Sequence, residues 1–292
     1  MGQKEYEEQL RELAQWISES RRIVFFGGAG VSTESGIPDF RSADGLYAEK
    51  RRYPSEQIVS HSFFLSHTEQ FYDFYKERML YPDAEPNAAH LALAALERQG
   101  KLSAVITQNI DGLHEKAGSK QVLPLHGTVL KNHCMRCGKF YSLAELLSRP
   151  GTVPHCDCGG IIKPDVVLYE EALDSALLTE AARRIAEADL LIVGGTRSRS
   201  IRRRDSCAIS ADVIWSSSTA AQRRQTGMRI WSYRRRSERC SPKPWKRHAE
   251  ARLLQYLRLQ SGLKSGKLSY RDIISLLPDV TGGRRPKGGR AK

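Results

Sequence analysis

Two close pairs of cysteines are the clearest chemical signal in the chain. Cys134 and Cys137 are separated by two residues, Cys156 and Cys158 by one, and eighteen residues lie between the pairs. This spacing is typical of a tetrahedral zinc site, with His155 as a substitute ligand beside the tighter pair. Glycines follow each pair, as in zinc ribbons, and argue against four unrelated free thiols. Because four thiolates fill the coordination sphere, we expect Zn²⁺ to be structural and not catalytic.

A glycine-rich turn is a second candidate site. The apolar residues 22–26 predict a buried parallel strand, and a Gly-Ala-Gly turn follows at residues 28–30. Ser32 or Thr33 is expected to cap a helix after the turn. Such a strand, turn and helix bind a dinucleotide pyrophosphate, because the backbone approaches the anion and helix N–H groups meet it. The alternative is a turn that needs glycine for structural reasons alone.

The elements expected around these residues are those of an α/β protein. Further strands are predicted at residues 104–107 and 189–193, and an amphipathic helix at residues 5–18. Strands that alternate with helices favour a doubly wound, Rossmann-like parallel sheet. The other expected helices lie at residues 69–80, 87–99 and 173–187.

Polar or glycine residues follow each predicted strand. Gln108, Asn109 and Asp111 come after the second strand, and Gly195 and Thr196 come after the third. Ligands of doubly wound sheets bind at the carboxyl ends of the strands. We therefore expect these residues and the glycine turn to line one crevice.

His126 follows another short apolar run. A neutral imidazole close to a nucleotide crevice can act as a general base. From position alone, a hydrogen-bonded structural histidine is the first interpretation. The same structural interpretation applies to His61, His67, His90, His114, His133 and His248.

The composition narrows the class of protein. Of 292 residues, 40% are hydrophobic and 27% are charged, which is a globular composition and excludes wholesale disorder. The chain has no run of 18 apolar residues, so we expect no membrane span and no membrane partner. The N-terminal residues lack an apolar signal segment. We therefore expect a cytoplasmic protein. In that compartment cysteines are more often metal ligands or free thiols than members of disulfides.

The charge is divided unevenly along the chain. Residues 1–196 hold 21 Lys and Arg against 27 Asp and Glu, a net charge of −6. Residues 197–292 hold 25 against 6, a net charge of +19. A basic block of this kind is typical of a solvated or nucleic-acid-binding segment.

Taken together, the motifs resemble those of the sirtuin family of NAD-dependent protein-lysine deacylases, and most of all its bacterial branch. The resemblance covers residues 1–196. The matching motifs are GAGVSTESGIPDFR at residues 28–41, TQNIDGLH at 107–114, LHG at 125–127, the four cysteines, and KPDVVLYEE at 163–171.

The resemblance implies a role for each motif. NAD would be a co-substrate, Zn²⁺ a structural ion and His126 the general base. Val167 and Tyr169 would line the acyl-lysine tunnel, beside backbone that pairs with an acetylated protein or peptide as an added strand. Phe40 would screen the nicotinamide pocket from a mobile loop. The residues implied to bind NAD are Gly28, Ala29, Gly30, Asp39, Phe40, Arg41, Gln108, Asn109, Asp111, Gly195 and Thr196.

The family's reaction would consume NAD. The acyl oxygen of the modified lysine would attack C1′ of the nicotinamide ribose, and nicotinamide would leave. His126 would then take a proton through the ribose hydroxyls. Water would finally release free lysine and O-acetyl-ADP-ribose.

The acyl preference depends on two tyrosines. Family members that remove succinyl or malonyl groups hold the extra carboxylate with a Tyr-x-x-Arg pair, whose letters occur at Tyr75 and Arg78. Spacing from the motif at residues 86–90 instead puts the pair at Tyr72 and Tyr75, without an arginine. We therefore expect a preference for acetyl groups, because a tyrosine cannot pair a carboxylate as an arginine does.

The resemblance breaks off inside a motif at Thr196. The family continues there with strands and loops that hold the adenosine half of NAD, whereas this chain turns strongly basic. We hypothesise a change of reading frame near codon 197, which would impair NAD binding. The alternative is a genuine basic tail that binds nucleic acid through phosphate contacts.

The expected organisation is one discontinuous NAD-binding domain at residues 1–196, followed by a basic region at residues 197–292 that is irregular or disordered. The domain would hold a helical module at about residues 42–87 and a zinc module at about residues 128–165. The expected function is deacetylation of protein lysines. The alternatives are a mono-ADP-ribosyltransferase on the same scaffold and a zinc-containing nucleic-acid binder that uses the basic tail.

Overall fold

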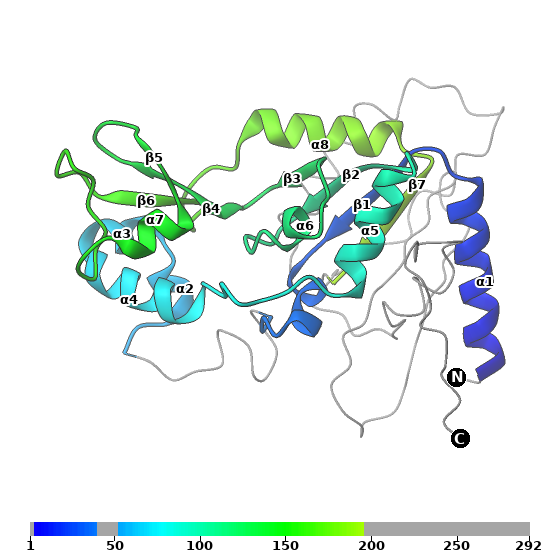
Figure 1. The fold of residues 1–292 in the computed structure, drawn as a ribbon, viewed down its shortest axis with the longest axis horizontal. Coiled ribbons are helices and arrows are strands. Elements are labelled where there is room, and N and C mark those ends of the chain that lie inside the picture. The colour runs from blue at the N-terminus through cyan, green and yellow to red at the C-terminus, as the bar shows by residue number, and fades with distance from the viewer. Residues whose placement is uncertain (1–2, 40–51, 196–292) are drawn as a thin grey trace, which may run out of the picture.

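The computed structural model describes residues 3–39 and 52–195. This part of the chain forms a parallel sheet with helices on both faces, and an arm that carries a second, antiparallel sheet and a group of short helices (Figure 1). Of the residues implied to bind NAD, Phe40, Arg41 and Thr196 lie outside the described residues. So does the whole basic region at residues 197–292.

The larger sheet has the order β3-β2-β1-β7. Its strands are β1 (Ile23–Gly27), β2 (Leu102–Thr107), β3 (Val122–Pro124) and β7 (Leu190–Gly194). Every pairing between them is parallel. The chain enters the sheet at β1 in the middle and adds strands to both sides, which confirms the predicted doubly wound arrangement.

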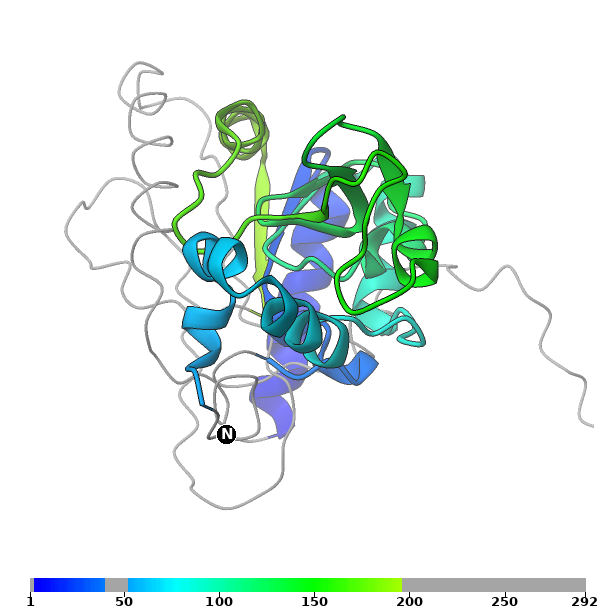
Figure 2. The same ribbon diagram turned by 90° about the vertical axis from the view of Figure 1, so that its left-hand side faces the viewer.

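Alternate residues of β1 face opposite helical layers, because successive side chains of a strand point to opposite faces. Phe25 packs in a core with α1 (Gln3–Glu19) and α5 (Ala88–Arg98). Phe26 packs in a second core with α8 (Ser175–Glu187), on the other face. Figure 2 shows α1 and α8 on opposite sides of the sheet. Both faces are therefore covered, as a parallel sheet requires.

The arm joins two parts of the chain that are distant in sequence. The antiparallel sheet has the order β5-β4-β6, and three short helices pack beneath it through a shared apolar cluster. Its strands and its helix are β4 (Gly127–Cys134), β5 (Phe140–Ser142), β6 (Ile162–Val166) and α7 (Leu143–Ser148). The three short helices are α2 (Ser55–Ile58), α3 (His61–Ser66) and α4 (Thr68–Arg78).

Two short segments follow strand ends of the parallel sheet. After β1 come two 3₁₀ turns, η1 (Ala29–Val31) and η2 (Thr33–Ser35). After β2 comes the single helical turn α6 (Leu113–Lys116). The prediction of a helix capped by Ser32 or Thr33 was wrong, because the Ser32 side chain makes no cap hydrogen bond and is used elsewhere. None of the helices among the described residues is long and apolar enough to cross a membrane.

Candidate active site and metal centre

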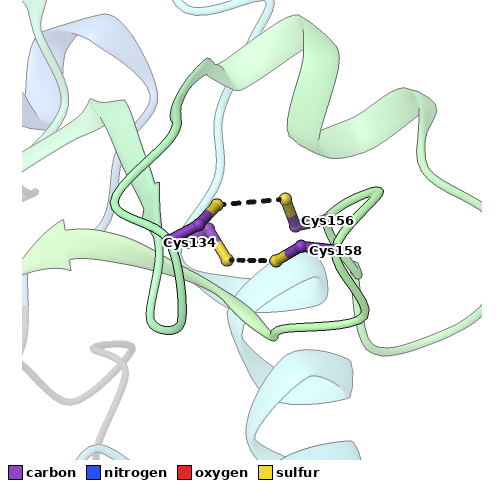
Figure 3. Close-up of side chains that lie close together, drawn as sticks. Cys134, Cys156 and Cys158 are labelled. Carbon is purple, nitrogen blue, oxygen red and sulfur yellow. Dashed lines mark hydrogen bonds between the residues drawn. The ribbon is translucent and has the colours of Figure 1, made fainter.

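The four cysteines form one group in the arm, and Figure 3 shows the side chains of Cys134, Cys156 and Cys158 close together. All four sulfur atoms are within 4.8 Å of one another. The Cys134 and Cys158 sulfurs are 3.4 Å apart, and the Cys137 and Cys156 sulfurs 3.6 Å. Disulfide sulfurs would be only about 2.05 Å apart. In a zinc tetrahedron with Zn–S bonds of about 2.3 Å, the sulfurs lie about 3.8 Å apart. The cluster therefore fits Zn²⁺.

Two turns aim the thiols at one point. The N–H of Gly138 donates to the Cys134 carbonyl, and the N–H of Gly159 donates to the Cys156 carbonyl. A Cβ on Gly160 would lie 2.7 Å from the Cys134 sulfur, so only glycine allows the two turns to approach this closely. Hydrogen bonds from the Cys158 backbone and from a tyrosine hydroxyl lower the pKa of Cys156 to about 6.

His155 does not join the thiol group. Among the described residues, the only group of three or more side chains suited to a metal is made of the four cysteines. The Nδ1 of His155 donates instead to the Val153 carbonyl at 2.9 Å. The four-cysteine ligand set therefore needs no substitute.

Three strands of the parallel sheet end at the same level, and these strand ends are the place of the predicted crevice. Gly27 at the end of β1 stands opposite Thr107 of β2 and Gly194 of β7. The N–H of Gly30 donates to the Gly195 carbonyl at 2.8 Å. A Cβ on Gly30 would lie 2.9 Å from Gly195 backbone atoms, so this glycine lets two strand ends touch. The strand ends of β1, β2 and β7 therefore lie side by side, and the binding role of their residues stays a prediction.

A buried polar network links the segments that follow β1 and β2. Asn109 donates through Nδ2 to the Ser32 hydroxyl at 2.9 Å, and that hydroxyl donates to the Asp111 carboxylate at 2.6 Å. Burial raises the pKa of Asp111, against the lowering effect of these hydrogen bonds. Ser32 belongs to the motif at residues 28–41, but nothing in that motif indicates its contact with Asp111. The two residues are 79 positions apart in the chain.

Gln108 and His126 sit beside this network. The Nδ1 of His126 lies 3.0 Å from the Gln108 carbonyl, which can only accept, so Nδ1 carries the proton and Nε2 keeps its lone pair. Burial lowers the pKa of His126, so the ring is neutral near pH 7. The Gln108 side-chain N–H₂ group is buried without a partner among the described residues. The Gln108 amide is thus a donor without an acceptor among the described residues, and the His126 Nε2 is an acceptor.

The segment predicted to bind substrate makes backbone hydrogen bonds with His126 and with the helical module. The N–H of Val167 donates to the His126 carbonyl at 2.9 Å, so the two residues are directly linked. Tyr169 exchanges backbone hydrogen bonds with Val59 and His61 of the helical module. Tyr169 is 47% exposed.

The two tyrosines considered for acyl selection lie in the interior. Tyr72 and Tyr75 are buried in the cluster between the short helices and the antiparallel sheet. The Tyr72 hydroxyl donates to the Ile162 carbonyl, whereas the Tyr75 hydroxyl has no partner among the described residues. Asp39 is the last described residue before the gap, so its role and those of Phe40, Arg41 and Thr196 stay predictions.

A doubly wound parallel sheet with an inserted module that carries four clustered cysteines defines a Rossmann-like α/β protein. The family model described as "Sir2 family" matches residues 28–201, more than half of the chain. The chain belongs to the Sir2 family.

Known relatives match the same region. A protein of Clostridium acetobutylicum named "NAD-dependent protein deacetylase" is 57% identical over 192 residues, which are 65% of this chain and 78% of the relative. A protein of the same name from Listeria innocua is 45% identical over 190 residues, 65% of this chain and 80% of the relative.

Solved structures agree in fold. One named "Sir2-p53 peptide-NAD+" has a TM-score of 0.55 and 44% identity, covering 63% of this chain and 74% of that one. Another, "Sir2 bound to acetylated peptide", has a TM-score of 0.56 and 42% identity, with 63% and 74% covered.

Proposed function

We propose that this protein is an NAD-dependent protein-lysine deacetylase that yields nicotinamide, O-acetyl-ADP-ribose and free lysine. The observation that carries the proposal is the buried network of Asn109, Ser32 and Asp111 next to a neutral His126. Amide, hydroxyl and carboxylate groups suit the carboxamide and ribose hydroxyls of NAD. The relatives named as NAD-dependent protein deacetylases support the same activity.

The crevice offers NAD a defined set of contacts. Gly28, Ala29 and Gly30 would hold the pyrophosphate, and the Gln108 side-chain N–H₂ group, which has no partner among the described residues, would donate to the nicotinamide end. When bound, NAD supplies a ribose carbon that becomes electrophilic as nicotinamide leaves. Asp39, Phe40, Arg41, Gly195 and Thr196 complete the proposed binding residues.

His126 would act as the general base. Its Nδ1–H is held by the Gln108 carbonyl, which leaves Nε2 to take a proton from a ribose hydroxyl. A lowered pKa keeps the ring unprotonated, and therefore able to accept, near neutral pH. The hydrogen bond from Val167 to the His126 carbonyl ties the base to the segment that would hold the acyl-lysine, with Tyr169 at its exposed end.

Zn²⁺ would hold the arm together. The four thiolates leave no ligand position for water, and the crevice lies on the other sheet. Thiolates need a reducing compartment to stay free, which supports a cytoplasmic location.

We propose acetyl as the preferred acyl group. The two tyrosines assigned to this choice, Tyr72 and Tyr75, carry no charge that could pair a succinyl carboxylate. When acetyl-lysine and succinyl-lysine peptides compete for the enzyme, we expect O-acetyl-ADP-ribose to form faster than the succinyl product. Equal or faster turnover of the succinyl peptide would contradict this preference.

The activity is tested with an acetyl-lysine peptide and NAD. We expect nicotinamide, deacetylated peptide and O-acetyl-ADP-ribose in equal amounts. Transfer of labelled ADP-ribose to protein without loss of acetyl groups would indicate the ADP-ribosyltransferase instead. Salt-dependent DNA binding with no consumption of NAD would indicate a nucleic-acid binder.

We expect a higher KM for NAD in this chain than in a variant with a family-like sequence after Thr196. The match to the Sir2 family ends at residue 201, and the resemblance assigns later residues to the adenosine half of NAD. Lost binding contacts raise KM more than they lower the rate of the chemical step. Replacing the residues after Thr196 with a family-like sequence should lower KM. An unchanged KM in that variant would contradict the proposed change of reading frame.

A further inference from the structure

Tyr141 of β5 touches the metal centre from outside the ligand set. Its side chain is 1% exposed, and its hydroxyl donates a hydrogen bond to the Cys156 sulfur at 3.0 Å. A thiolate can only accept, so the hydroxyl hydrogen must point at the sulfur. We propose that Tyr141 is a positioning residue of the metal centre, whose hydroxyl holds the Cys156 thiolate and strengthens the binding of Zn²⁺.

The need for such a donor follows from charge. Zn²⁺ with four thiolates carries a net charge of about −2, which is costly inside a protein unless donors and cations surround it. The Cys134 sulfur already accepts from the N–H of Arg136 at 3.4 Å. Cys134 and Cys156 are the two buried cysteines, whereas Cys137 and Cys158 are exposed and can meet water. The Tyr141 hydroxyl is therefore placed where water solvates the thiolate least.

The tyrosine ring is itself held by cations. The Lys139 ammonium lies 5.3 Å from the ring centroid, and the Arg149 guanidinium 5.0 Å. Both cations pair with Asp157, at 2.9 Å and 2.6 Å, and Asp157 stands between Cys156 and Cys158 in the chain. The ligand turn, the two cations and the ring thus form one connected unit. Groups that orient metal ligands in this way typically account for about 10–100-fold in metal affinity.

The test replaces the hydroxyl alone. Tyr141→Phe keeps the ring between its cations and leaves the Cys156 thiolate without its donor. In the full chain loaded with zinc, we expect Tyr141→Phe to lose zinc to a chromogenic chelator with an apparent affinity about 10–100-fold weaker than the unmutated chain. Loaded with Co²⁺, the variant should also show a shifted sulfur-to-cobalt charge-transfer band, which a role in packing alone would not move.

The matched control is Tyr53→Phe. Tyr53 also has a guanidinium over its ring, that of Arg52 at 5.4 Å, but it lies in the helical part of the arm and not in the thiol group. This control should retain the zinc affinity of the unmutated chain. Equal zinc affinity of Tyr141→Phe and Tyr53→Phe would overturn the proposal.

A folding failure of Tyr141→Phe would be recognised by zinc content below one ion per chain in excess zinc. In that case 3-fluorotyrosine at position 141, a stronger hydrogen-bond donor, should raise the zinc affinity, and an unchanged affinity would overturn the proposal. Absence of zinc from the unmutated chain would refute the metal centre itself. The deacetylase proposal is tested separately, because no readout here depends on NAD.

Discussion

The metal centre and the strand-end crevice place their functional side chains by different means. The thiols come from two tight turns in one antiparallel sheet, at residues 134–137 and 156–158. In the crevice, Ser32, Asn109 and His126 follow different strands of a parallel sheet and meet only because those strands end in register. One site depends on local turn geometry and a bound ion, and the other depends on the packing of the whole sheet.

This difference predicts how each site fails. The core around the thiols consists of Cys134, Tyr141, Leu146, Cys156 and Ile162, so two of its five members are ligands. Such a core cannot persist without its metal. The crevice is supported by two larger clusters on the two faces of the sheet, and a single substitution there should leave the fold standing.

Removal of a zinc ligand should have the largest effect. We expect Cys134→Ser to abolish zinc binding and to unfold the antiparallel sheet, because metal binding is folding free energy in modules of this size, typically about 10 kcal/mol or more. Metal analysis and near-UV circular dichroism measure both changes. The controls Cys207→Ser and Cys240→Ser, which lie in the basic region outside the resemblance to the family, should each retain one zinc ion. Zinc loss in either control would show that the substituted cysteine is also a zinc ligand.

Loss of the base should come next, and should leave the fold intact. We expect His126→Ala to lower the deacetylation rate by on the order of 10²–10⁴-fold. Nicotinamide exchange should suffer less, because nicotinamide leaves before the base is needed. The matched control is His155→Ala, since both Nδ1 atoms donate to a backbone carbonyl. Equal losses in the two variants would remove His126 from the mechanism.

Two buried histidines should make the parallel-sheet region sensitive to acid. The rings of His90 and His114 lie 4.7 Å apart, and burial lowers both pKa values, that of His90 to about 4. Because the unfolded chain binds protons below about pH 6.5 and the folded chain does not, stability is complete above that pH. It should fall by about 3 kcal/mol for His90 as the pH drops to about 4.

The measurement is denaturant unfolding between these pH values, compared with His90→Gln. The variant should show a shallower loss of stability with acid. His67→Gln serves as the control, because His67 lies nearer the surface and should keep the slope of the unmutated chain. Parallel curves for His90→Gln and the unmutated chain would show that the pair does not control acid stability.

The smallest effect is expected in the crevice network. Ser32→Ala leaves the Asn109 amide and the Asp111 carboxylate without their shared partner. Buried polar groups that lose a partner cost about 1–3 kcal/mol, so we expect a loss of unfolding free energy of that size and weaker NAD binding. Thr33→Ala is the control, since its hydroxyl donates to the Gly30 carbonyl at 3.1 Å. An equal loss in both variants would show that the network contributes nothing special.

Local pattern predicted the elements closely. The apolar run at residues 22–26 became β1, and the helix expected at residues 173–187 was observed as α8 (Ser175–Glu187). These elements form because their apolar side chains have the right period for a strand or a helix. The prediction for Ser32 was wrong because its hydroxyl contacts a residue that is distant in the sequence. Serine near a helix start is usually a cap, but a buried carboxylate from another strand competes for its hydroxyl.

The sequence by itself determined the metal centre, since its ligands lie in short turns whose cysteine and glycine spacing is legible without a fold. It also determined which strand ends carry polar groups. Only the tertiary structure decided which of those groups touch, that Ser32 joins Asn109 to Asp111, and that Tyr141 reaches Cys156. The physical reason is that a hydrogen bond requires atoms within about 3 Å, and distances between separate elements are set by core packing rather than by spacing along the chain.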